Sequence, residues 1–370
     1  MISVNDRLVS EAISHAVDLD QYGTWVVRRM LALLNRVDAD LFAQLTAALV
    51  NLDAESFTVE RLEALLMSVR TMHAQAYLQL DRALTNELRE FVAAEWGYQQ
   101  QLLPSVGVPL SFGTGVATAE QVYAAAMSRP FQGRLLSEWA SGIEAQRMTR
   151  IRDAVRIGFV ENESVQQIVR RVRGTRAAGY SDGLIEIDRR HAEAVVRTAV
   201  QHVAAVAQDR MIEANLDLIK AVQWHAKLDL RTSPTCRVRD GLLYTPDTHK
   251  PIGHKVPWLS GPGRSHWNCR SLAVQMLKSF EEVTGIAGVG EIPVGARASM
   301  DGALPADLTY GQWLQKQSAA RQDEVVGPTR GALMREGKLP FDELYSRRGE
   351  MLTLDQLRER NGAAFKRAGV

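Results

Sequence analysis

The chain has 370 residues, of which 46% are hydrophobic and 24% are charged, and its formal net charge is +1. This length and apolar content suffice for two or three domains with buried cores, so the composition excludes an intrinsically disordered protein. Because 44 basic residues nearly balance 43 acidic ones, the whole chain has no global attraction to nucleic acid or to membranes, and any charge-driven contact must be local.

Cysteine usage and the N-terminal sequence indicate synthesis in a reducing cytoplasm. The chain has two cysteines, Cys236 and Cys269, which cannot form a disulfide framework at this length. The start, MISVNDRLVSEAISHAVDL, lacks the basic residues and apolar run of a signal peptide. The longest uncharged stretch, 96–119, contains two prolines and several glycines, so we predict no transmembrane segment.

Residues 1–103 are predicted to form an N-terminal helical region with one long helix. TWVVRRMLALLNRV (24–37) and ADLFAQLTAALVNL (39–52) are apolar-periodic segments separated by a short polar break. A longer run starts at VERLEALL (59–66) and would reach roughly 60 Å if unbroken. A helix of this length either packs on partner proteins or forms one arm of an intramolecular bundle.

The stretch 104–118 is predicted to be a linker, because prolines and glycines interrupt every helical pattern there. A second helical region, 119–220, follows. It comprises AEQVYAAAM, GRLLSEWASGIEAQRMTRIRDAVRIGFV, SVQQIVRRVRG and HAEAVVRTAVQHVAAVAQDRMIEANL. Asp188 is predicted to be the N-cap of the last of these helices.

The second helical region carries a stripe of arginines. Its acidic residues between 147 and 176 are only Asp153, Glu161 and Glu163. The planar guanidinium fork suits phosphate oxygens, so these side chains are candidate DNA contacts; the alternative is a solvated or acid-paired helix face. The candidates are Arg147, Arg150, Arg156, Arg170, Arg171, Arg173 and Arg176.

The sequence pattern changes at about residue 221, where alternation of apolar and polar residues, typical of strands, and turn-forming residues begin. Residues 221–278 are predicted to be a small β-rich module, with an Asp240-Gly241 turn and a final strand at SLAVQM. The C-terminal extension, 279–370, starts irregular and becomes helical. Thr309 with Gln312 and Thr353 with Gln356 fit capping boxes, and Gly327-Pro328 separates two short helices. The fold class is therefore mainly α with a small β-rich module (α+β), in an extended multi-segment helical protein.

The module contains a set of candidate metal ligands. Cys236 lies before a loop rich in proline and glycine, and His266 and Cys269 lie after it. These are zinc ligands, and a metal that closes the loop would stabilise a module with little core. The fourth ligand is not signalled by spacing, since Ser233 stands three residues before Cys236. The other candidates for it are His225, Asp229, Asp240, His249 and His254.

Three other interpretations of the module remain open. The two cysteines could be packed thiols beside a hydrogen-bonded histidine, able to form a disulfide on oxidation. Cys and His could form a nucleophile pair, although nothing marks an oxyanion hole. DTHKP and HWNCR could belong to a His-Asn-His type nuclease, although its paired CxxC knuckles are absent. For Asp229 and Arg231 we predict a structural ion pair.

The stretch LDLRTSPTCRVRDGLLY, followed after a proline-rich loop by SHWNCRS, resembles the phage Mu F-type family of minor head proteins, also called phage head morphogenesis proteins. Several members carry two cysteines in the first knuckle, where this chain has Ser233. Similarity to the family extends to RRHAEAVVRTAVQHVA and YGQWLQKQSAARQDEVVGPTRGALMREGKLP. The positions that match the family pattern are Asp229, Arg231, Thr232, Cys236, Asp240, Gly241, Tyr244, His266, Cys269 and Arg270.

The resemblance implies a virion protein of the phage head, made in the host bacterial cytoplasm and associated with the portal vertex in few copies. It implies portal and capsid proteins as partners, with double-stranded DNA as a further candidate, and a role in DNA packaging or ejection. We expect no catalytic activity and no obligatory cofactor other than the candidate zinc. The rival interpretations are a metal-dependent nuclease or peptidase that uses the Cys/His module, and a DNA-binding adaptor.

Overall fold

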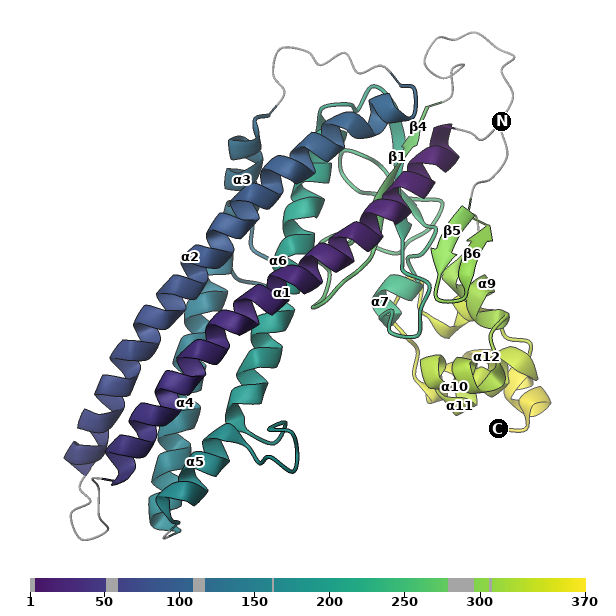
Figure 1. Ribbon diagram of the computed structural model, residues 1–370. Helices are drawn as coiled ribbons and strands as arrows, with labels where there is room; N and C mark the ends of the chain where they lie inside the picture. Colours follow the sequence, from purple (N-terminus) through teal and green to yellow (C-terminus); the bar gives the residue numbers. More distant parts are fainter. Residues whose placement is uncertain (1–3, 51–58, 109–116, 162, 279–295, 306–307) are drawn as a thin grey trace, which may run out of the picture. The chain divides into compact units, whose positions relative to one another are not determined.

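The computed structural model describes residues 4–50, 59–108, 117–161, 163–278, 296–305 and 308–370. Helices dominate the described chain, as Figure 1 shows, and the predicted fold class is confirmed. Among the described helices, none combines the length and apolar content needed to cross a bilayer. The helices are α1 (Val4–Val50), α2 (Val59–Ser105), α3 (Ala119–Ser128), α4 (Leu136–Val160), α5 (Val165–Arg173), α6 (Leu184–Glu213), α7 (Pro234–Arg237), α9 (Tyr310–Gln315), α10 (Ala319–Val326), α11 (Pro328–Arg335), the 3-10 helix η1 (Phe341–Leu344) and α12 (Leu354–Ala368).

The β-rich module is built around one antiparallel sheet with strand order β3-β2-β1-β4. Its central strand, β1, pairs with β4 over most of its length, including Val222 opposite Gln275 and Trp224 opposite Ala273. A separate two-stranded hairpin, β5-β6, follows. The strands are β1 (Ile219–His225), β2 (Leu243–Tyr244), β3 (Pro251–Ile252), β4 (Leu272–Leu277), β5 (Ala296–Ser299) and β6 (Gly302–Pro305).

The chain divides into two compact units whose boundaries fall inside α1, α2, α3 and α6. Unit 1 comprises Met1–Asp20, Ala94–Val122 and Gln201–Val370, and unit 2 comprises Gln21–Ala93 and Tyr123–Val200. The predicted linker at 104–118 begins with the last two residues of α2, and its central part, 109–116, lies outside the described residues.

Unit 2 is an all-helical core. Leu41, Leu45 and Leu49 recur every fourth residue on α1 and are fully buried, because this spacing places them on one helix face. They pack with residues of α4 and α5, such as Val155 and Ile168. The predicted polar break near residue 38 is wrong: α1 runs without interruption from Val4 to Val50.

Helix α1 continues through residue 38 because Asp38 is buried inside unit 2 with charged partners. Its carboxylate accepts hydrogen bonds from Arg147 and, at 2.9 Å, from Arg189, while Arg147 also reaches the Tyr77 hydroxyl at 3.3 Å. The Arg147 and Asp38 side chains are only 1% and 3% exposed. A similar pair joins Arg150 to Asp188 at 2.5 Å. Helix α6 begins at Leu184, so Asp188 lies within the helix. The prediction that Asp188 is its N-cap is wrong.

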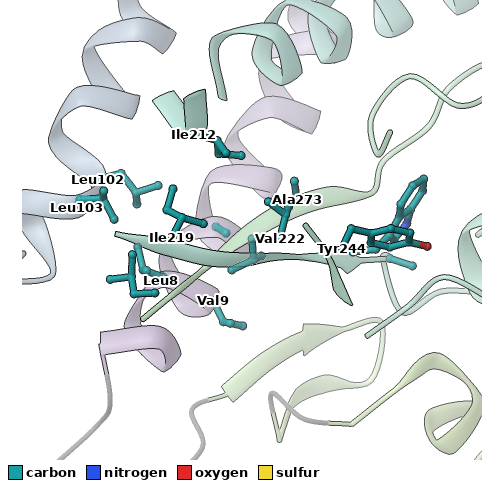
Figure 2. Packing of buried hydrophobic residues seen from close by; sticks show 14 of the residues in the cluster. Leu8, Val9, Leu102, Leu103, Ile212, Ile219, Val222, Tyr244 and Ala273 are labelled. Atoms are coloured by element: carbon teal, nitrogen blue, oxygen red, sulfur yellow. The ribbon is translucent and has the colours of Figure 1, made fainter. Parts of the chain in front are cut away.

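The core of unit 1 forms where helix ends cover the sheet. Figure 2 shows Leu8 and Val9 of α1, Leu102 and Leu103 of α2, and Ile212 of α6 around Ile219 and Val222 of β1. Trp224, Tyr244, Cys236 and Cys269 belong to the same cluster and are almost completely buried. The small sheet thus obtains its hydrophobic cover from helices that are distant in sequence.

The C-terminal extension has its own core, formed by α9 to α12 together with Leu228. Both predicted capping boxes are confirmed at Thr309 and Thr353, whose hydroxyls accept the N–H of Gln312 and Gln356. The chain also breaks at the predicted place, because Gly327 adopts φ +86° between α10 and α11. Of the stretch predicted to be irregular before these helices, residues 279–295 lie outside the described residues. The prediction is wrong for the described part, because Ala296–Ser299 and Gly302–Pro305 pair as the β5-β6 hairpin.

Replacement of Asp38 by Ala tests the buried ion pair. The change leaves the Arg147 guanidinium buried without its carboxylate, so we expect the free energy of unfolding of unit 2 to fall by about 3–5 kcal/mol. Urea denaturation followed by circular dichroism measures the decrease, and hydrogen exchange assigns it to residues 21–93 and 123–200.

Two controls accompany this experiment. Asp153→Ala removes the carboxylate of an exposed pair with Arg152 and is expected to change stability by less than about 0.5 kcal/mol. Asp38→Leu combined with Arg147→Leu is expected to recover much of the stability, because no unpaired buried charge remains. Equal effects of Asp38→Ala and Asp153→Ala would contradict the prediction.

Candidate functional site

The first part of the candidate site is the segment that leads into the short helix α7. Ser233 is its N-cap, with the hydroxyl accepting the backbone N–H of Cys236 at 3.3 Å, and Pro234 occupies the first helical position. This local sequence fixes the turn and directs Cys236 into the core, where it is 1% exposed.

The second part of the site is the segment 264–271, which contains His266 and Cys269. Arg264 anchors it to α6 through an ion pair with Asp209 at 2.6 Å. The Cys269 N–H donates to the His266 carbonyl at 3.2 Å, which closes a tight turn. Asn268, within the turn, adopts φ +55°, a left-handed conformation that asparagine tolerates better than most residues.

The structure brings the two segments together. Cys236 Sγ lies 3.7 Å from Cys269 Sγ and 3.0 Å from His266 Nε2. The ligand atoms of all three residues lie within 4.8 Å of one another. Ser233 Oγ approaches the same imidazole nitrogen at 2.7 Å. Residues about 30 positions apart in sequence therefore form one compact Cys/His cluster, defined here as Cys236, His266 and Cys269.

The imidazole of the cluster is held in one orientation. His266 Nδ1 lies 2.9 Å from the carbonyl oxygen of Trp267. A carbonyl only accepts hydrogen bonds, so we assign the ring hydrogen to Nδ1, which leaves the Nε2 lone pair directed at Cys236 and Ser233. The ring is thus positioned to accept a proton or to coordinate a cation at Nε2.

The two thiols are electrostatically different. The hydrogen bond that Cys269 shares with Cys236 lowers the pKa of Cys269, and the contact with His266 lowers it further. The same hydrogen bond, together with burial, raises the pKa of Cys236. Burial alone would favour neutral imidazole, but the hydrogen bond and charge of Cys269 outweigh it and raise the pKa of His266.

Burial restricts what the cluster can do chemically. Cys236 and Cys269 are 1% and 0% exposed, so neither sulfur presents a face to a macromolecular substrate. The adjoining cavity has a volume of about 10 Å³, which is room for about one water molecule or ion. The arrangement suits metal binding or disulfide formation better than attack on a peptide or nucleotide.

An ion pair joins the same two segments beside the cluster. Arg270 donates to both carboxylate oxygens of Asp229, at 2.5 and 2.9 Å. Thr232 adds a hydrogen bond to Asp229 Oδ1 at 3.1 Å. The predicted Asp229–Arg231 ion pair is wrong, since Arg231 reaches Asp229 only through its backbone N–H, at 3.1 Å. A bidentate arginine is geometrically specific, so this contact fixes how the segments meet.

Asp240 connects the module to the C-terminal extension. Its buried carboxylate accepts the backbone N–H of Ala226 at 2.7 Å and that of Tyr310, at the start of α9, at 2.6 Å. Gly241 adopts φ +80°, and a side chain there would approach Thr309 closely. Tyr244 is buried in β2, with its ring centroid 4.8 Å from that of Trp258. These matched positions hold the module together.

The proposed fourth ligands are engaged elsewhere. His225 Nε2 contacts Gln223 at 2.7 Å, His254 Nε2 donates to the Leu243 carbonyl at 2.9 Å, and His249 stacks on Trp258. Asp229 and Asp240 make the contacts given above. Within the described residues, none of these five joins the Cys/His cluster.

The seven candidate DNA-binding arginines have different environments. Arg147 is buried, Arg150 is paired with Asp188, and Arg171 is held by Glu161 and Glu163 at 2.6 and 2.5 Å. Arg173 is exposed but lies over the rings of Phe42 and Tyr180. Arg156, Arg170 and Arg176 are exposed.

Two buried arginines of the site had no sequence signal. Arg237 donates to the Val325 carbonyl at 2.7 Å, and Arg239 donates to the carbonyls of Thr235 and Pro257 at 2.7 and 2.9 Å. Because their partners are backbone carbonyls, no acidic residue at a characteristic spacing could have revealed them. They tie α7 to the long loop and to the C-terminal extension.

The Asp229–Arg270 pair predicts a pH dependence. Burial alone would raise the Asp229 pKa, but the Arg270 hydrogen bonds and charge outweigh it and lower the pKa. The carboxylate therefore stabilises the fold above its unfolded-state pKa of about 4, and this contribution disappears as the pH falls through the lower folded-state pKa. Asp229→Asn should melt at a lower temperature than the wild type at pH 7, and the difference should shrink below about pH 4.

Thermal denaturation of both proteins across this pH range measures that difference. Arg270→Gln should show the same dependence, because Asp229 then lacks its cation. A difference that stays constant with pH would contradict the assignment.

The comparisons with known proteins agree with the motifs. Residues 149–274, about a third of the chain, match the family model described as Phage Mu protein F like protein. The match starts in α4, ends in β4 and includes the whole Cys/His cluster. The searches of curated proteins and of solved structures give no match. A domain of this family indicates a phage head morphogenesis protein and a location in the virion. The chain thus carries, over residues 149–274, a phage Mu F-like domain.

Proposed function

We propose that this protein is a minor head protein of the portal vertex, present in few copies, that acts in head assembly and in DNA packaging or ejection without catalytic activity. The observation that carries the proposal is the phage Mu F-like match over residues 149–274, which covers all but the last four residues of the module 221–278. The partners would be the portal protein and capsid proteins.

The geometry of the module supports a structural role. Its two thiols are buried in the core, and the adjoining cavity of about 10 Å³ does not admit a nucleotide or peptide. Its other matched residues, Asp229, Arg270 and Asp240, use their charges in contacts within the fold. These features are expected of a module that keeps its conformation during assembly.

The helical regions are long enough to contact a portal ring or a capsid shell. Helices α1 and α2 have 47 residues each, which corresponds to about 70 Å at about 1.5 Å per residue. Both expose large apolar side chains, including Trp25 at 47% and Leu78 at 55%. Such residues are available to a partner protein.

Inactivation of the gene in the phage or prophage that encodes the chain tests this function. We expect the chain in purified wild-type particles at few copies relative to the major capsid protein, measured by quantitative mass spectrometry. An early stop codon should leave capsids that assemble but contain less DNA or infect poorly, and a copy supplied in trans should restore them. A cryo-electron microscopy map should show density for the chain at the portal vertex.

Two outcomes would contradict the proposal. Mature particles without the chain, combined with normal DNA content and infectivity of the stop-codon mutant, would exclude a head role. Cleavage of plasmid or peptide by the purified chain, abolished in His266→Ala, would establish the rival enzyme function.

A contact with double-stranded DNA is the second candidate function, and the exposed arginines around the end of α5 favour it. Arg170 and Arg176 are exposed, whereas the Arg171 guanidinium is already bound by Glu161 and Glu163. We expect Arg170→Ala with Arg176→Ala to weaken duplex binding and to reduce the salt slope by about 1 for each phosphate that is no longer neutralised.

Fluorescence anisotropy with a labelled duplex, repeated over a range of salt concentrations, measures both effects. Arg171→Ala is the matched control and should change the affinity less. Binding that is indifferent to salt and to the double substitution would exclude this function.

A further inference from the structure

We propose that Cys236, His266 and Cys269 bind one zinc ion, which fastens α7 to the segment 264–271. The inference is independent of the role at the portal vertex, because it depends only on the geometry of the Cys/His cluster. Cys236, His266 and Cys269 are the three strong ligands, and water or the Ser233 hydroxyl takes the fourth position.

The distance between the sulfurs fits a shared metal. Two thiolates bound at about 2.3 Å to one tetrahedral zinc lie about 3.8 Å apart. The observed separation of Cys236 Sγ and Cys269 Sγ is 3.7 Å. A disulfide would require the sulfurs to approach to about 2.05 Å, through movement of two buried segments that other contacts already fix.

The imidazole is the third ligand. A nitrogen bound at about 2.1 Å to the same ion would lie about 3.6 Å from each sulfur. His266 Nε2 is 3.0 Å from Cys236 Sγ, so the ring needs to withdraw only slightly to admit the metal. Its Nδ1 already donates to the Trp267 carbonyl, as the second ring nitrogen of zinc-bound histidines commonly does.

The charge balance suits a buried site. Zinc with two thiolates and a neutral imidazole carries no net charge, so burial does not leave an unpaired ion. Of the cations that line the adjoining cavity, Lys227 and Arg270 are already paired, with Asp20 and Asp229. The charges of this lysine and arginine would therefore repel a divalent cation less than unpaired charges would.

Ser233 defines the fourth position. It stands three residues before Cys236, and its hydroxyl already lies 2.7 Å from His266 Nε2, beside the cavity of about 10 Å³. A thiolate at this position would complete a tetrahedral set of three cysteines and one histidine. The native serine therefore makes this a weaker zinc site than a complete one.

Metal analysis of the full-length chain tests the proposal. We expect about one zinc per chain after purification without chelator. Titration of the metal-free protein, prepared with a chelator, with Co²⁺ should give thiolate-to-cobalt charge-transfer absorption. His266→Gln and Cys269→Ser should abolish that absorption. His254→Gln is the matched control, because it changes a histidine of the same module that lies outside the cluster, and it should keep the metal.

Ser233→Cys provides a gain-of-function test that misfolding cannot imitate. The added thiolate should raise the zinc affinity by about tenfold or more, measured by competition with a chromophoric chelator. Absence of thiolate-to-cobalt absorption in both the wild type and Ser233→Cys would overturn the proposal. A wild-type chain isolated under reducing conditions with a Cys236–Cys269 disulfide would also overturn it.

Discussion

The contact between the α7 segment and the segment 264–271 is the constraint on which the module depends. The residues between them include two short strands and a loop rich in proline and glycine, and they contribute Tyr244 and Trp258 to the core. Two sets of contacts close this loop, namely the bidentate Asp229–Arg270 pair and the buried Cys/His cluster. Because both sets join the same segments, each restricts the geometry available to the other.

The closed module in turn positions the C-terminal extension. A single buried carboxylate, that of Asp240, accepts backbone N–H groups from Ala226 and from Tyr310. The Tyr310 hydroxyl donates back to the Asp229 carbonyl at 2.9 Å, and Arg237 reaches the Val325 carbonyl. Neutralising Asp240 would weaken contacts on both sides of the module at once. The extension is therefore built into unit 1 through the same residues that match the family pattern.

Local interactions in this chain could be predicted from its sequence, whereas interactions between distant residues could not. The capping boxes at Thr309 and Thr353 join residues three apart, and the helical periods of α1 and α4 are likewise short-range patterns. Asp38 resembles a helix break and Asp188 a helix cap, yet their partners are Arg147, 109 positions away, and Arg150. The spacing of apolar residues along a helix indicates which face of the helix is buried. It does not indicate which charged residue of another helix lies against that face. The cluster was different, because the family resemblance paired the two segments that carry Cys236, His266 and Cys269.

The same distinction decides how the arginine stripe and the cluster bear on function. Several arginines that the sequence offers to phosphate are engaged inside unit 2, so the composition of 147–176 overstates the surface available to DNA. The cluster shows the opposite relation, since its residues lie close together but its sulfurs face no solvent. A catalytic thiol needs access for its substrate, whereas a thiol that fixes two segments needs exclusion of water and rigid neighbours. Nearly complete burial of both sulfurs therefore fits thiols that fix two segments better than a catalytic thiol.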